Sequence, residues 1–173
     1  MTPPGAISQI KLPDGSLIGM RPDSELKLSP PPQANAAAPL GVALVRGAAR
    51  VIGVELIDSK KVSNFQLQSG PAVLTLKGAD LESAVILPPG GGGKPAPSTT
   101  APGSYQRLLV GSASVGNGPL TEALVPRQVS FVGGANTAPV AVASVPPTVF
   151  AANRTLSGPG VGADAGLRLG ATG

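Results

Sequence analysis

Few side chains in this chain of 173 residues could carry out acid–base, nucleophilic or metal chemistry. The sequence has no histidine and no cysteine, which removes the commonest general base and metal ligand together with the thiolate nucleophile. Among the nine acidic residues, the closest groups are Asp23 with Glu25, Glu55 with Asp58, and Asp80 with Glu82. Alternating carboxylates could bind calcium, but calcium usually draws about six or more oxygen ligands. We therefore interpret them as solvated turn residues, and predict no catalytic, metal-binding or cofactor-binding residue and no enzymatic activity.

A run of glycines before a lysine, from Gly90 to Lys94, invites comparison with a phosphate-binding loop. The P-loop pattern is G-x-x-x-x-G-K-[ST], and its backbone amides hold the phosphates. Here Pro88 and Pro95 occupy the positions of the first glycine and of the Ser/Thr. Proline has no amide hydrogen, so the sequence excludes a P-loop.

The net charge of +4 and the pI of about 9.9 raise the question of nucleic-acid binding. Only 13% of the residues are charged and 2% are aromatic, and Lys60–Lys61 is the sole adjacent basic pair. Binding to phosphates needs a denser basic patch, and stacking on bases needs rings. We therefore predict no nucleic-acid partner. The sequence also has no secretory signal pattern and no run of about 18 apolar residues, so we expect no membrane partner.

Short apolar runs between glycines and prolines favour strands over helices. The 24 glycines and 20 prolines would interrupt long helices. Around residues 74–77, leucines alternate with polar residues, as in a strand with one buried face. A helix over 42–57 is the alternative at one place, and its glycines disfavour it. The predicted strands cover residues 41–46, 50–57, 62–68, 72–78, 84–87, 105–111, 128–132 and 139–145.

Several short strands at this spacing predict an all-β sandwich or barrel with an aliphatic core. Residues 1–39 are interpreted as an N-terminal hairpin over 7–20, with a turn at Pro13-Asp14-Gly15, followed by an extended arm and linker. The β-sandwich domain is expected at 40–149, with a flexible insertion at 88–104. A C-terminal tail is expected at 150–173.

The stretch LTLKGADL at 74–81, followed by SAVIL at 83–87, resembles the immunoglobulin-like domains of the IPT/TIG group and related bacterial and phage modules. The resemblance implies that Gly78 permits a corner in the chain and that Leu81 fills the space between two sheets. It departs from that group in its lack of core aromatic residues and in the insertion after Leu87. Together with the strand pattern, it predicts a small immunoglobulin-like β-sandwich with extended Pro/Gly-rich N- and C-terminal arms.

Such a domain, without catalytic groups and with arms that can order on a partner, suits an assembly of subunits. We expect a non-enzymatic structural protein, namely a phage virion component that decorates or cements the capsid or is associated with the tail. Its expected partners are subunits of the same assembly, as a homo-oligomer or on a capsid or tail lattice, and its expected location is the virion. The alternative is an immunoglobulin-like protein-binding module of a bacterial cell-surface or secreted system. The expected contact regions are 1–39, 88–104 and 146–173.

Overall fold

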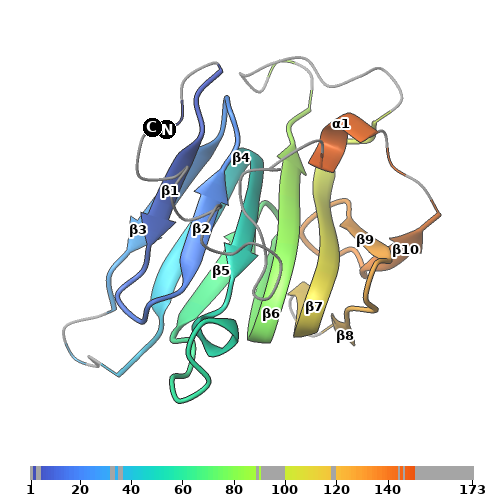
Figure 1. The fold of residues 1–173 in the computed structure, drawn as a ribbon. Coiled ribbons are helices and arrows are strands. Elements are labelled where there is room, and N and C mark those ends of the chain that lie inside the picture. Colours follow the sequence, from blue (N-terminus) through green and yellow to red (C-terminus); the bar gives the residue numbers. More distant parts are fainter. Residues whose placement is uncertain are drawn as a thin grey trace.

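A computed structural model gives the fold of the chain (Figure 1). It describes residues 2, 5–31, 34, 37–88, 90, 100–117, 120–143, 145 and 147–150. Nearly all regular structure in these residues is strand, so the prediction of an all-β fold is confirmed. In chain order the elements are β1 (Ser8–Lys11), β2 (Leu17–Met20), β3 (Glu25–Ser29), β4 (Leu40–Ile52), the 3₁₀ helix η1 (Val54–Leu56), β5 (Phe65–Ser69), β6 (Ala72–Ile86), β7 (Gly103–Asn117), β8 (Leu120–Ala123), β9 (Val129–Val132), β10 (Val140–Val142) and α1 (Pro147–Phe150).

The three long strands β4, β6 and β7 each bend at a glycine. Gly47, Gly78 and Gly111 have φ angles of +83°, +57° and +86°, in the left-handed region that only glycine enters without steric cost. Before its bend β4 pairs with β3 and β5, and from Gly47 onward it pairs with β2 and β6. The bends therefore fold one continuous ten-stranded sheet of the described chain into two layers.

We name the two layers by their strands. Layer A contains β3, β5, β8 and the segments 40–46, 72–77 and 112–117 of the long strands; layer B contains β1, β2, β9, β10 and the segments 47–52, 80–86 and 103–110. Buried side chains of both layers belong to one cluster, for example Leu44 and Leu74 from layer A and Val51 and Leu81 from layer B. The layers therefore enclose a single, mostly aliphatic core.

The predicted hairpin over 7–20 is present as β1 and β2. At its turn Gly15 has a φ of +100°, and the Asp14 carboxylate accepts a hydrogen bond from the Ser16 amide at 2.8 Å. The hairpin is part of the folded unit, because β2 pairs with β4 and Ile18 lies in the core. The β3–β4 pairing crosses the boundary predicted at residue 39.

Four of the predicted strands are halves of two longer ones. The strands predicted at 41–46 and 50–57 are one strand, β4, which ends at Ile52, and those predicted at 72–78 and 84–87 are both parts of β6. The predicted breaks were wrong because a glycine with positive φ redirects a strand without ending its pairing. Gly78 does lie at a corner, and Leu81 just after it is fully buried.

Two of the predicted contact regions lie mostly outside the described residues. Of the insertion at 88–104, the structure describes 88, 90 and 100–104, and the last two residues begin β7. Of the contact region at 146–173, it describes 147–150, which form α1, so Phe150 is the one described residue of the tail predicted at 150–173.

Candidate functional site

The described residues contain no group of three or more Asp, Glu, His or Cys side chains that could hold a metal ion. In the same part of the chain, no helix has the length and apolar character to cross a membrane. The three acidic groups noted in the sequence are not brought together, and five of the six carboxylates have donor or basic neighbours of their own. For example, the Glu25 carboxylate lies 3.5 Å from Arg46 Nε and 4.0 Å from Lys27 Nζ.

Glu55 and Asp58 hold the loop that follows η1. The Glu55 carboxylate accepts hydrogen bonds from the Ser63 amide at 2.7 Å and from the Ser63 hydroxyl at 2.6 Å. Burial acts to raise the pKa of Glu55, but these hydrogen bonds outweigh it and the pKa is lowered. Asp58 accepts from the Lys60 amide at 3.1 Å. These two acids are therefore loop-stabilising groups, as turn residues often are.

Asp80 and Glu82 are strand residues in β6, so their interpretation as solvated turn residues was wrong. Asp80 is 1% exposed and accepts two hydrogen bonds from Arg50 of β4, at 2.8 Å from Nε and 2.6 Å from Nη2. Glu82 accepts from Arg107 of β7 through Nε at 2.8 Å and also through Nη2. The Arg50–Asp80 contact engages both carboxylate oxygens, and bidentate contacts of this kind are among the strongest polar contacts in proteins.

The strand register places these charges in one row across layer B. Arg50 is opposite Glu82, and Glu82 is opposite Arg107. The next residues, Val51 and Leu81, point into the core, and side chains alternate along a strand. The row therefore lies on the outer face of layer B. We call Arg21, Arg50, Asp80, Glu82 and Arg107 the charged row.

Arg21, directly after β2, links the charged row to α1. Its Nη1 donates a hydrogen bond to the Val149 carbonyl at 3.0 Å. Burial lowers the pKa of the Arg21 guanidinium, and the nearby Glu82 carboxylate opposes that shift. The Arg107 guanidinium lies 4.7 Å from the centre of the Phe150 ring, within the range of a cation–π contact. Two arginines of the charged row therefore hold α1 on the outer face.

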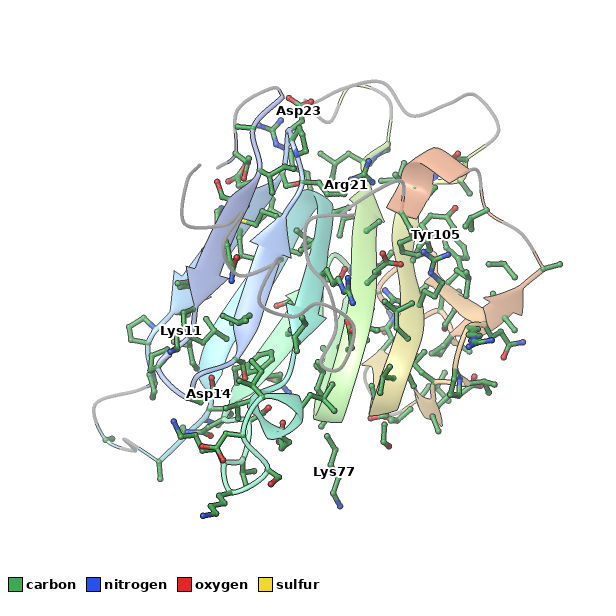
Figure 2. All side chains as sticks on the ribbon, viewed as in Figure 1. Lys11, Asp14, Arg21, Asp23, Lys77 and Tyr105 are labelled. Carbon is green, nitrogen blue, oxygen red and sulfur yellow. The ribbon has the colours of Figure 1, made fainter. Side chains whose placement is uncertain are left out.

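An apolar patch beside the charged row receives the side chains of α1. Val149 and Phe150 are buried against Ala84 and Tyr105 in a cluster separate from the main core. The Tyr105 hydroxyl donates to the Ala101 carbonyl at 2.8 Å, and burial raises the pKa of Tyr105. In Figure 2, Arg21 and Tyr105 lie at the end of layer B where α1 sits.

The polar and apolar groups of this face already have partners within the chain. Each carboxylate of the charged row already accepts from a guanidinium, so neither is a free base. The charged row and the apolar patch therefore hold α1 against layer B.

The model of the FecR protein family matches residues 1–87, half of the sequence. The chain belongs to the FecR protein family. The matched region of this FecR-family chain contains β1 to β6 and, with them, four members of the charged row, up to Glu82.

Two crystal structures of a candidate anti-sigma factor from Parabacteroides distasonis ATCC 8503 have a similar fold. Both have a TM-score of 0.54, and the sequence identities are 16% and 15%. Each alignment covers 82% of the FecR-family chain and 57% of the other chain, so the chain spans less than two thirds of that protein. No curated protein matches the chain.

These comparisons overturn the family and the function predicted from sequence. The resemblance to IPT/TIG immunoglobulin-like domains was wrong, because LTLKGADL lies inside the FecR match. The motif describes a strand that bends at a glycine, and such bends are not specific to one family. The predicted phage virion component, its capsid or tail lattice partners and its virion location were also wrong, and the alternative of an immunoglobulin-like cell-surface module is not supported.

The arginines of the charged row were not among the residues predicted from the sequence. A signal was present, since Arg50, Glu82 and Arg107 each stand next to core aliphatic residues within strand patterns. Opposite charges in neighbouring strands stabilise a sheet when they lie opposite one another. That pattern can be recognised only when the pairing register of the three strands, which are far apart in the sequence, is known.

Proposed function

We propose that this chain is a non-enzymatic regulatory module of the FecR family that takes part in the control of a sigma factor through contacts with proteins. The match of the FecR family model to residues 1–87 is the observation that carries the proposal. The fold shared with the candidate anti-sigma factor from Parabacteroides distasonis supports it. An anti-sigma factor acts by binding, so a chain in this role needs recognition surfaces and no reaction centre.

The residues support recognition over catalysis. The sequence offers neither histidine nor cysteine, so the usual general base and nucleophile are lacking. The carboxylates of Asp80 and Glu82 are paired with Arg50 and Arg107. Because the chain aligns with 57% of the candidate anti-sigma factor, the proposed role is that of this module alone.

The proposal is tested by transcript profiling of the organism that carries this gene. Deleting the segment that encodes the chain should change the transcription of a group of genes that share one promoter class. Restoring the wild-type chain should reverse the change. Unchanged transcripts in the deletion strain, with the wild-type chain shown to be present and folded in the parent, would contradict the proposed regulatory role.

A further inference from the structure

The loop between η1 and β5 is fixed at its base. The amides of Ile57 and Asp58 donate to the Val54 carbonyl at 2.9 and 2.7 Å, and the Lys61 amide closes a turn on the Asp58 carbonyl at 3.0 Å. Ser63 is held by the Glu55 carboxylate. We name residues 57–62 the tip. Figure 1 shows this loop projecting beyond the ends of β5 and β6.

Although it is fixed, the tip exposes two aliphatic side chains. Val62 is 77% exposed, the largest value among the exposed large hydrophobic residues of the described chain, and Ile57 is 48% exposed. The turn from Asp58 to Lys61 brings its two ends close together, so Ile57 and Val62 flank the same turn. Isolated exposed aliphatic residues are ordinary, but two on one rigid projection form a small patch that a partner can cover.

The exposed charged residues around this patch are lysines, whereas the carboxylates near it are half-buried. Lys60 and Lys61 are exposed within the tip, and Figure 2 shows Lys11 and Lys77 at the same end of the molecule. The carboxylates of this end accept hydrogen bonds from residues of two neighbouring loops. Glu55 accepts from Ser63, Asp58 from the Lys60 amide, and Asp14 from the amides of Ser16 and Asn64.

An apolar centre with a charged rim fits a protein surface better than a membrane or a nucleic acid. Stable membrane anchoring needs two signals, such as a lipid chain together with a polybasic patch, and two aliphatic side chains with two lysines do not provide them. The tip also has no aromatic residue that could lie at a membrane–water interface. Phosphate contacts alone would leave Ile57 and Val62 uncovered. We propose that the tip docks into a partner protein at an apolar pocket lined by carboxylates.

This inference rests on the proposed function, since it names the chemistry of the partner surface, and its test uses no transcription partner. The full isotope-labelled chain is titrated with a short peptide of alternating leucine and glutamate, and amide NMR shifts are followed. A leucine–lysine peptide, a glycine–glutamate peptide, anionic phospholipid vesicles and a DNA duplex are the comparison probes. We expect the leucine–glutamate peptide to bind most tightly and to shift residues 57–63.

Variants then test the two parts of the patch. Lys60→Glu/Lys61→Glu should lower the affinity for the leucine–glutamate peptide by about tenfold or more and raise the affinity for the leucine–lysine peptide. Ile57→Asp should also lower the affinity for the leucine–glutamate peptide. Val140→Asp is the matched control, because Val140 is equally exposed, at 48%, on β10, and it should leave the affinity unchanged.

Several outcomes would overturn the inference. They are the absence of shifts with every peptide, shifts centred on the charged row instead of the tip, tighter binding of vesicles or DNA than of the acidic peptide, and an affinity that the lysine reversal leaves unchanged. Any of these leaves the regulatory role standing, because transcript profiling tests that role separately. Conversely, the peptide result can hold even where transcripts do not change.

Discussion

Gly111 of β7 and Gly78 of β6 are in direct contact where the two strands bend. A Cβ atom at Gly111 would lie 1.7 Å from the carbonyl oxygen of Gly78, far inside any contact that real atoms make. The bends are therefore packed backbone against backbone. The two-layer fold depends on the lack of a side chain at this crossing as well as on the positive φ angles.

The variant Gly111→Ala should be strongly destabilised. We expect a loss of about 3 kcal/mol or more in the free energy of unfolding, because one of the two strands must move away. Gly90→Ala is a matched control, since Gly90 has a φ of +88° and nothing within 4 Å of an added Cβ. It should lose only about 1 kcal/mol, from backbone strain. Urea unfolding measures both, and similar losses would show that the crossing is not tightly packed.

Breaking the Arg50–Asp80 pair should cost much more than breaking an exposed pair. Arg50→Met leaves the Asp80 carboxylate buried without its guanidinium, and we expect a loss of about 3–5 kcal/mol in unfolding free energy. Arg46→Met removes a partner of Glu25, whose side chain is 29% exposed, and should cost about 1 kcal/mol or less.

The double variant Arg50→Met/Asp80→Leu separates pairing from packing. It should recover most of the loss seen with Arg50→Met, because no unpaired charge is left buried. A double-mutant cycle by chemical denaturation gives the coupling energy. Coupling near zero would mean that the two side chains do not depend on each other.

The hydrogen bonds from Ser63 should make stability depend on acid pH. The pKa of Glu55 lies below its ordinary value of 4.5 in the folded chain. Its contribution to the unfolding free energy is therefore complete above pH 4.5 and is lost as the pH falls through the lowered pKa. Ser63→Ala removes the hydroxyl donor, so this variant should lose less stability on acidification than the wild type.

Ser59→Ala is the control for that experiment, because Ser59 is an exposed residue of the same loop. Its urea unfolding curves should follow the wild type at every pH. Equal acid dependence of Ser63→Ala and the wild type would show that the Ser63 hydroxyl does not lower the pKa of Glu55.

Tyr105 reports whether α1 is docked, because it is the only tyrosine of the chain and no tryptophan is present. Burial holds its pKa above the ordinary 10.0. Phe150→Ala should loosen α1 and lower the pKa of Tyr105 toward 10.0, as measured by alkaline absorbance titration. Val140→Ala, on the exposed strand β10, should leave the titration unchanged. If Phe150→Ala leaves the pKa of Tyr105 unchanged, α1 does not shield the ring.

Some of the fold could be predicted because it depends on residues close in sequence. The turn at Asp14 and Gly15 follows from an acceptor side chain beside a residue that tolerates positive φ. Alternation around 74–77 gives a strand with one buried face, and Leu74 and Leu76 are indeed buried. The bend at Gly47 was predicted as a turn between two strands, since a glycine alone does not tell whether pairing continues through it.

The candidate site could not be predicted in the same way. Arg50, Glu82 and Arg107 meet only because three strands pair in one register. A shift of one residue would turn each of these side chains toward the core. The separate roles of Glu55 and Asp80, one in a loop and one buried in a sheet, depend on the same long-range arrangement.

The sequence by itself determined that the chain is built from aliphatic strands and lacks the usual catalytic side chains, because composition and local alternation suffice for both. The tertiary structure alone decided which charges are paired, where α1 docks and which aliphatic residues remain exposed at the tip. The physical reason is that these properties depend on strand register and on bends at glycine, which join residues that the sequence keeps far apart.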